Sequence, residues 1–507
     1  MPSKDNANPQ QGPIPVFETV PYETVPPAQT VGSAPAVIPE VLPDETEETP
    51  ESLTVSDIGG NSGIYDGPPP IDDSAFDSNN KSRFIFIAVG IGIFLLVFFG
   101  ILSFLLSLRG KNQPVVLEYW GLWESEKIYQ GVIADYHRLN PSVTIKYIKK
   151  DPKSYREKLV TQGKEGRGPD IFRFHNTWLP SIAEIAAPIP KNIMTNDEFE
   201  KTFYKVAQED LKIDTSYHGL PLEIDGLILV YNNNLFKKAG ILSSPKTWED
   251  LVKASNTLRV QDTSNNILTS GIALGTSNNI EHFSDIMGWM FIQNGADIRQ
   301  LNAPEAVQVL IDYRRFAEPP LNFWSEKMPN NISAFVQEKV AMIIVPSWQI
   351  IEIKQSNPDI DIKTASLPVL PGGQPISIAS YWVEGVSRTS KNQEEAWKFL
   401  KYLTTKEIME KLYKTEAETR LFGEPYSRVD LQQKLIQNEY IGPVLEQAPF
   451  MKSLPVISRT YDNGLNDQII SYLNDAVEAT IQGVSYEEAM GKASQGVKQV
   501  LEQFNIK

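Results

Sequence analysis

The sequence of 507 residues contains no cysteine. This absence excludes a disulfide framework, thiolate catalysis and a zinc site built from cysteine ligands. It also excludes anchoring of this chain through a lipid-modified cysteine. If the protein is held at a membrane, another feature of the sequence must hold it.

Histidine is scarce as well, and the four present are His137, His175, His218 and His282. None of them belongs to an H-x-x-H or H-E-x-x-H pair. The sequence also lacks a Walker phosphate loop, a G-x-G-x-x-G dinucleotide motif and a nucleophile elbow. We therefore predict no catalytic residue, no metal and no cofactor, and expect a binding protein rather than an enzyme.

The sequence has no excess of basic residues, because 47 lysines and arginines face 63 acidic residues, a net charge of −16. Residues 1–83 carry −11 of this charge and the rest of the chain carries −5. A surface that binds phosphates would need the opposite sign. Nucleic acid is therefore not an expected partner.

Residues 1–83 contain 14 prolines and no tryptophan. Such a composition buries too little apolar surface to offset chain entropy, so we predict a disordered, acidic, proline-rich tail. A short repeat occurs in it, F-E-T-V-P from Phe17 and Y-E-T-V-P from Tyr22. It is either a docking motif for a partner or low-complexity sequence, and the second interpretation is favoured.

Residues 84–108 form a run of 25 residues without a charged side chain. At about 1.5 Å per residue, a helix of this length exceeds the roughly 30 Å hydrocarbon core of a bilayer. We predict a single transmembrane helix that acts as an uncleaved signal anchor at the cell membrane. Two basic residues lie close to each end, so charge barely discriminates the orientation.

Residues 114–507 alternate between strand and helix patterns. Strands are predicted at 115–120, 143–147 and 171–174, with helices at 126–139 and 155–162 between them. Strand–helix–strand alternation predicts an α/β domain with a parallel sheet. Further strands are predicted at 226–231 and 340–345. The helices predicted near the end of the chain cover 394–403, 465–481 and 486–504.

Five segments, in order, carry a resemblance to a known family. They are V-V-L-E-Y-W-G-L-W-E from Val115, G-R-G-P-D-I-F-R-F-H-N-T-W from Gly166, H-G-L-P-L-E-I-D-G-L-I-L-V-Y-N-N-N-L-F from His218 with P-K-T-W-E-D-L after it, E-K-V-A-M-I-I-V-P-S-W from Glu338, and E-E-A-W-K-F-L-K-Y-L-T from Glu394. Together they resemble the extracellular solute-binding proteins of ABC importers, in the maltose- and oligosaccharide-binding family.

The resemblance implies a periplasmic-binding-protein-like fold with two discontinuous α/β lobes. One lobe is expected to cover about 114–224 with a segment after about 380. The other is expected to cover about 226–378 with much of the C-terminal helical region, and the chain should cross between them near 223–227 and 378–382. The lobes are expected to close around a carbohydrate, which an ABC permease then receives. On this basis the tail is placed in the cytoplasm and the binding domain outside.

Polar and aromatic residues follow the strand that ends at Phe174. Open α/β sheets bind ligands at the carboxyl ends of their strands, which places His175, Asn176 and Trp178 at a cleft. Alternatively, His175 only caps a turn. Tryptophan faces complement the C–H faces of sugar rings, although most tryptophans belong to cores. The other aromatic candidates are Trp123, Trp289, Trp348, Tyr381, Trp382 and Tyr461. Two acids next to them in the sequence, Glu124 beside Trp123 and Asp462 beside Tyr461, are candidates as well. The resemblance assigns stacking to Trp348.

Glu223 and Asp225 lie two residues apart, on the same side of an extended backbone. A glycosidase sets its two carboxylates about 5–9 Å apart across the scissile bond. Neighbours on one strand point in parallel, so a role in binding sugar hydroxyls is favoured. The resemblance assigns ligand contact to Asp225, and Glu223 serves either the ligand or the hinge.

Two other functions stay open. One is a membrane-tethered enzyme that processes glycosides, which needs a second carboxylate across the cleft. The other is a sensor or scaffold in which the tail signals inside the cell, and the repeat beginning at Phe17 is its only support in the sequence.

Overall fold

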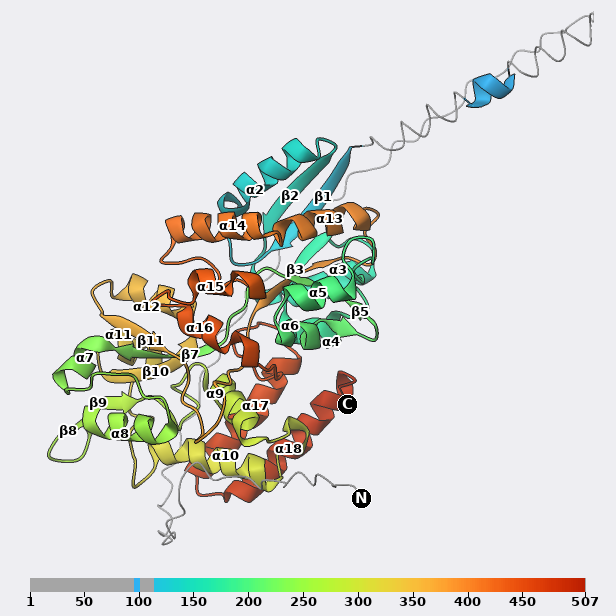
Figure 1. Cartoon of the computed structure of the whole chain (residues 1–507). Helices are drawn as coiled ribbons and strands as arrows, with labels where there is room; N and C mark the ends of the chain where they lie inside the picture. Colours follow the sequence, from blue (N-terminus) through green and yellow to red (C-terminus); the bar gives the residue numbers. More distant parts are fainter. Residues whose placement is uncertain (1–94, 101–113, 507) are drawn as a thin grey trace, which may run out of the picture. The chain divides into compact units, whose positions relative to one another are not determined.

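The computed structural model describes residues 95–100 and 114–506 (Figure 1). Residues 95–100 are helical and exposed, and they belong to a unit separate from the domain that begins at Pro114. No helix within the described residues is long and apolar enough to cross a membrane. The predicted tail at 1–83 lies outside the described residues, as does most of the predicted membrane segment at 84–108.

The first lobe is built on a five-stranded sheet with the order β2-β1-β3-β12-β6. Its strands are β1 (Val115–Gly121), β2 (Val143–Lys149), β3 (Ile171–His175), β6 (Leu220–Pro221) and β12 (Trp382–Val386). β1 pairs in parallel with β2 and β3, as the sequence predicted. β12 runs antiparallel to β3, because it enters from the other lobe and not through a strand–helix–strand crossover.

Helix α2 (Glu126–Leu139) shows why the first lobe folds as it does. Ile128, Val132 and Tyr136 recur every four residues and are buried, so one stripe of the helix covers the sheet. α2 packs on β2 and against α13 (Gln393–Leu403) and α14 (Lys406–Thr419), which lie alongside it in Figure 1. The other helices on this side are α3 (Tyr155–Lys164), α4 (Leu179–Ile182), α5 (Asn196–Thr202) and α6 (Lys205–Asp210).

The second lobe has its own five-stranded sheet, with the order β11-β7-β10-β9-β8. Its strands are β7 (Leu227–Asn232), β8 (Val260–Gln261), β9 (Ile267–Ile272), β10 (Val340–Pro346) and β11 (Ile362–Ala365). β10 is buried along its whole length, since helices cover both faces of this central strand. It is parallel to β9 and antiparallel to β7, so the sheet is mixed.

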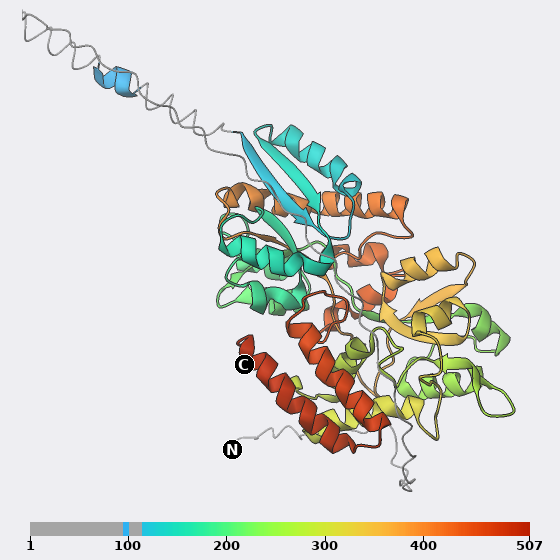
Figure 2. The ribbon, with the colours of Figure 1, turned by 180° about the vertical axis from the view of Figure 1, so that it is seen from behind.

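Helices surround the second sheet. α8 (Trp248–Leu258) begins with a capping box, in which Thr247 and Asp250 exchange hydrogen bonds. The long helices α17 (Leu465–Ile481) and α18 (Tyr486–Gln503) lie side by side in Figure 2 and pack on α9 and α10. The remaining helices of this side are α7 (Asn233–Lys238), α9 (Phe283–Asn294), α10 (Pro304–Arg314), α11 (Asn331–Val336), α12 (Gln349–Ser356), α15 (Gln432–Leu435) and α16 (Gly442–Gln447).

The chain passes between the sheets at 222–226, between β6 and β7, and again at 366–381, between β11 and β12. These two passages pair with each other through an antiparallel bridge between Gly226 and Ala379. A Cβ atom on Gly226 would lie 2.3 Å from the carbonyl oxygen of Ile378, so only glycine allows this approach. The two lobes are therefore joined by backbones in direct contact.

Candidate functional site

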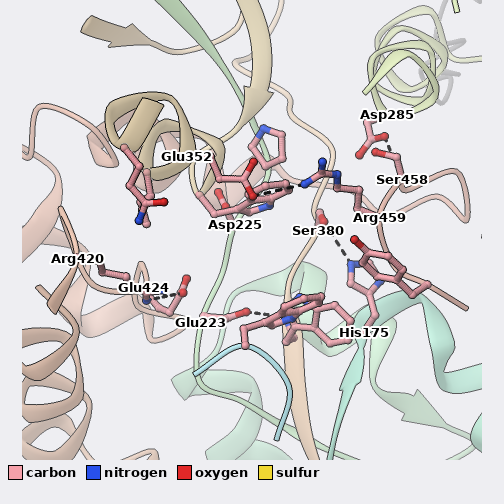
Figure 3. Close-up of a pocket in the computed structure, with 17 residues that line it drawn as sticks. His175, Glu223, Asp225, Asp285, Glu352, Ser380, Arg420, Glu424, Ser458 and Arg459 are labelled. Carbon is pink, nitrogen blue, oxygen red and sulfur yellow. Dashed lines mark hydrogen bonds and ion pairs between the residues drawn. The ribbon is translucent and has the colours of Figure 1, made fainter. Parts of the chain in front are cut away.

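A cavity of about 380 Å³ lies where the passages between the sheets meet the ends of the strands (Figure 3). It collects side chains from both lobes, from both passages and from the C-terminal segments. Cavities of 300–1,000 Å³ that combine rings with a few polar groups are typical small-molecule sites. This cavity is the candidate functional site.

Aromatic rings cover the first-lobe side of the cavity. Trp382, at the start of β12, lies edge-on to Trp123 and to Trp178, with ring centroids 5.4 Å apart in both pairs. It also lies edge-on to His175 at 5.2 Å. Tyr461 reaches the same wall, 6.0 Å from Trp123. Trp123, Trp382 and Tyr461 are only partly buried, which leaves ring surface for a ligand.

Trp348 lies on the second-lobe side, directly before α12. It is the one partly exposed residue in the stretch from Val340 to Ile350. The guanidinium of Arg459 lies 5.5 Å from its ring centroid, and the His282 ring lies 5.6 Å away. The cavity therefore has an aromatic surface on each lobe.

Asp225 lies at the first passage between the lobes, and its side chain is 3% exposed. Oδ1 accepts hydrogen bonds from the backbone N–H of Gly226 at 2.7 Å and of Ser347 at 3.3 Å. Oδ2 has no hydrogen-bond partner within the described part of the chain. Burial raises the pKa of Asp225 to about 7, since it disfavours the charged form.

Glu223 lies on the same passage, where its Oε1 accepts from the backbone N–H of Trp382 at 3.0 Å. Burial, followed by the nearby Glu424, raises the pKa of Glu223 well above its usual range. Carboxylate oxygens of Glu124, Glu223 and Glu424 lie within 4.8 Å of one another. The bond to Trp382 ties Glu223 to the start of β12, directly after the second passage, so the residue faces the cavity and also connects the first passage to this strand.

His175 ends β3, where it both caps a turn and lines the cavity. Its Nδ1 lies 2.8 Å from the Thr177 hydroxyl, as expected of a turn cap, and its Nε2 lies 3.3 Å from the Ser380 hydroxyl on the cavity side. Burial lowers the pKa of His175 to about 3. The ring is therefore neutral at ordinary pH and serves as a hydrogen-bonding group.

Seven of the twelve predicted site residues line the cavity: Trp123, His175, Glu223, Asp225, Trp348, Trp382 and Tyr461. The structure places the other five outside the lining: Glu124, Asn176, Trp178, Trp289 and Tyr381. All five are buried, and their polar groups are engaged elsewhere or enclosed by the core.

Glu124 pairs with Arg173 at 2.5 Å, and the same arginine pairs with Glu384 at 2.6 Å. Asn176 donates to Asp210 at 3.0 Å, and the Tyr381 hydroxyl donates to the same carboxylate at 2.7 Å. These contacts lie behind the cavity wall.

Trp178 is 1% exposed and supports Trp382 from behind. Trp289 is fully buried, stacks on Trp248 with centroids 4.9 Å apart, and donates to the carbonyl of Ile376. Both residues are core tryptophans, because their ring faces are already covered by the protein.

Several lining residues escaped the sequence reasoning: Asp285, Pro346, Ile351, Glu352, Gln355, Ser380, Arg420, Glu424, Ser458 and Arg459. Most come from helices and loops far along the chain, where no strand end marks a cleft. One signal was available, the turn-forming Asn463-Gly464 pair after Tyr461. In the structure Arg459, Tyr461 and Asn463 all adopt positive φ angles of 57°, 55° and 44°.

Asp462 holds this unusual loop in place and does not line the cavity. Its carboxylate accepts from the backbone N–H of Gly464 at 3.0 Å and of Asn466 at 2.9 Å, and Arg156 donates to its carbonyl. Left-handed conformations at ordinary residues cost free energy and persist where the surroundings fix them. The loop is fixed so that Arg459 and Tyr461 both reach the cavity.

Comparison with known proteins relates this architecture to a family. The profile of the bacterial extracellular solute-binding protein family matches residues 121–410, more than half of the chain. The maltotriose-binding protein of Pyrococcus abyssi (strain GE5 / Orsay) is 22% identical over 388 residues, which are 73% of this chain and 80% of that protein. The maltodextrin-binding protein MdxE of Bacillus subtilis (strain 168) is 27% identical over 297 residues, which are 55% of this chain and 67% of that protein.

Solved structures agree with the fold. A cyclo/maltodextrin-binding protein complexed with maltotetraose superposes with a TM-score of 0.64 at 19% identity, covering 77% of this chain and 98% of that one. The sugar-binding protein MalE from Xanthomonas citri gives 0.63 at 17% identity, with the same coverage. The predicted two-lobed α/β fold is thereby confirmed for the domain that begins at Pro114. With its family profile matched over more than half of its length, the protein belongs to the bacterial extracellular solute-binding proteins.

Proposed function

We propose that the protein is a receptor that captures a carbohydrate, an oligosaccharide in particular, between its two lobes for an ABC import permease. The observation that carries the proposal is the composition of the cavity. Trp123 and Trp382 face it from the first lobe, Trp348 from the second, and Asp225 and Glu223 lie between them. Rings stack on the C–H faces of sugars, and carboxylates accept from their hydroxyl groups.

The names of the relatives support this proposal. The maltotriose- and maltodextrin-binding proteins described above are named for the carbohydrates that they bind. Their sequences match the domain that holds the cavity. We expect binding without turnover, in which contacts to both lobes favour the closed arrangement. The permease would then recognise the closed form.

The melting temperature of the protein, measured with a panel of ligands, tests the proposal. A ligand that binds only the folded protein raises its stability by RT ln(1 + [L]/Kd), about 2.7 kcal/mol at a hundredfold excess over Kd. The full chain should be heated with oligosaccharides, monosaccharides, amino acids and short peptides. The proposal expects the largest rise with an oligosaccharide, and a rise confined to amino acids or peptides would contradict it.

We further propose that residues 84–108 anchor the protein in the cell membrane, with the binding domain outside and the tail in the cytoplasm. The support is the uncharged run of 25 residues and the absence of cysteine. Protease treatment of intact cells tests the orientation. Loss of the binding domain is expected, and its survival in a protein fractionating with the surface membrane would contradict the outward placement.

A further inference from the structure

The cavity lining holds more acidic groups than its own cations can pair with. Five acidic side chains line it against two arginines, and both arginines are already paired. Arg420 pairs with Glu416 at 3.2 Å and Glu424 at 2.6 Å. Arg459 likewise pairs with two acids, Glu281 and Glu352. Each guanidinium therefore meets two carboxylates, and neither offers an anionic ligand an unshared positive charge.

Two buried acids of the lining have no cation beside them. Asp225 and Asp285 are 3% and 1% exposed, and in the described ranges neither forms an ion pair with a lysine or arginine. The Asp285 carboxylate accepts from the Ser458 N–H at 3.0 Å, and its nearest ring, His282, is neutral because burial lowers its pKa to about 4. Asp225 Oδ2 lacks any partner among the residues described. A buried carboxylate without a partner is costly unless a ligand supplies one.

Glu223 is a third buried acid of the lining, and it lies in a cluster of glutamates. Its carboxylate shares a space with those of Glu124 and Glu424, all with oxygens within 4.8 Å of one another. Arg173 and Arg420 pair with the two outer glutamates, whereas within the described part of the chain the Glu223 carboxylate accepts from the backbone N–H of Trp382 and forms no ion pair. The acids therefore follow the cavity from Glu223 through Asp225 to Asp285.

The aromatic rings that face these acids suit the same ligand. The face of a tryptophan or tyrosine ring is electron-rich and attracts a cation within about 6 Å. Trp348 already does so, with the Arg459 guanidinium 5.5 Å from its centroid. The open faces of Trp123, Trp382 and Tyr461 offer the same environment to a ligand.

We propose that the solute of this cavity carries a protonated amine, so that the carbohydrate is an amino sugar with free ammonium groups. The identification as a sugar rests on the proposed function, whereas the positive charge rests on the acids and rings. An ammonium group has three N–H donors, which matches a space where carboxylates converge. Beside a neutral sugar the buried acids can be neutralised only by protons, whereas an ammonium group can take the place of those protons.

Protonation supports the proposal. Burial raises the pKa of Asp225 to about 7 and of Asp285 to about 6, and an opposite charge nearby would lower both. An ammonium ligand should therefore displace protons when it binds near pH 6. The titratable or charged side chains that face these acids around the cavity are His175, Glu223, His282, Glu352, Arg420, Glu424, Arg459 and Tyr461.

A divalent metal ion is the competing cation. Arg173 and Arg420 already lie against the glutamate cluster, and their charges oppose a dication there. The indole rings of Trp123, Trp348 and Trp382 also offer a metal no ligand atom, since metals such as calcium bind through oxygen. These features favour an ammonium group over a metal.

The test compares two disaccharides that differ only in charge. The β-1,4-linked disaccharide of glucosamine and cellobiose share their linkage, and one carries ammonium groups where the other carries hydroxyls. Calorimetry of the full chain at pH 6 should show the glucosamine disaccharide binding at least about tenfold more tightly. The heat should also differ between buffers of different ionisation enthalpy, because protons are released.

Variants locate the effect. Asp225→Asn should reduce affinity for the glucosamine disaccharide by about tenfold or more, and by a clearly larger factor than its affinity for cellobiose, because the amide keeps an acceptor for hydroxyl groups but loses the charge. Asp197→Asn removes the same charge from an exposed position on α5, where the side chain is 73% exposed, and should change neither. Circular dichroism of each variant verifies that it is folded.

Other outcomes separate this proposal from the proposed function. If cellobiose or another neutral oligosaccharide binds as tightly as the glucosamine disaccharide, the proposal of a positively charged ligand is wrong, and the proposal of a carbohydrate ligand stands. If spermidine binds more tightly than every sugar, the ligand is positively charged as proposed, but the proposal of a carbohydrate ligand is wrong. Binding of calcium alone that Asp225→Asn abolishes would assign the acids to a metal, and absence of binding by every amine would overturn the proposal.

Discussion

At the scale of single residues, the cavity depends on carboxyl groups whose pKa is raised by burial, so that their protonated form is favoured. Asp225 illustrates this best, because its pKa is raised to about 7 while one of its oxygens lacks a partner within the described chain. The resemblance to the solute-binding family assigned a ligand contact to this position. It could not show burial, since burial depends on Ser347 and on segments distant in the chain.

Titration of Asp225 should make stability depend on pH. Well below pH 4 the carboxyl is protonated in folded and unfolded chains alike; as pH rises through 4 towards 7 the unfolded chain loses its proton first, so the folded state loses stability. Asp225→Asn cannot titrate. The free energy of unfolding of the variant, relative to wild type, should therefore rise by up to about 4 kcal/mol across this range.

Denaturant titrations at pH 4, 5.5 and 7 measure that difference. His175 and His282 titrate in both proteins, so their contribution cancels in the comparison. A difference that stays constant across the three pH values would show that the carboxyl of Asp225 is ionised in the folded protein throughout.

Two tryptophans that were both candidate ligand contacts in the sequence should differ clearly in their effects on binding and stability. Trp348→Ala removes a ring that faces the cavity, and we expect carbohydrate affinity to fall at least about tenfold, with a small change in melting temperature. Trp289→Phe removes a buried hydrogen bond and leaves space in the core, so it should lower stability by about 1–3 kcal/mol and leave affinity unchanged. Fluorescence titration and thermal unfolding measure both quantities. The reverse pattern would place the site elsewhere.

At the scale of elements, the sequence predicted only part of the regular structure. Helix α2 begins and ends at the predicted residues, because its apolar residues recur every four positions and Asn140-Pro141 follows it. β12 was not predicted as a strand, and Trp382 lies at its start. Its five residues gain their strand character from pairing with β3 and β6, which periodicity within the segment does not report.

A buried ion network connects β3 to β12. Arg173 on β3 pairs with Glu384 on β12 and with Glu124, and all three side chains are no more than 3% exposed. Arg173→Met would leave two buried carboxylates without their counter-ion, so we expect a loss of about 3–5 kcal/mol in the free energy of unfolding. Arg167→Met, which removes an exposed pair with Glu165, should cost less than about 1 kcal/mol. Equal effects in denaturant titrations would contradict the importance of the buried network.

The contact between the two passages should depend on Gly226. A methyl group there would meet the carbonyl oxygen of Ile378 at 2.3 Å, so Gly226→Ala should destabilise the protein by about 1–3 kcal/mol. Gly491→Ala is the matched control, since it lies in α18 with no atom within 4 Å of the added Cβ, and should stabilise by about 0.5–1 kcal/mol. Thermal unfolding compares the two, and a harmless Gly226→Ala would mean that the passages can separate.

At the scale of the whole molecule, the two-lobed fold was predicted from the resemblance of five ordered segments to a known family, whereas the strand–helix alternation alone predicted only an α/β domain with a parallel sheet. The composition of the cavity was predicted only in part. Strand ends and the first passage were recognisable, whereas Arg420, Glu424 and Arg459 come from C-terminal segments that reach the cavity only once the chain has passed between the lobes. Their positions depend on tertiary structure and leave no periodic pattern.

The central claim is that a carbohydrate binds between Trp348 and the aromatic residues of the first lobe. Isothermal titration calorimetry of the full chain with a panel of neutral and amine-bearing oligosaccharides tests it most directly. We predict saturable heat with a stoichiometry of one for at least one oligosaccharide, lost or strongly reduced in Trp348→Ala. An absence of heat with every carbohydrate, or heat unchanged by that substitution, would contradict the account.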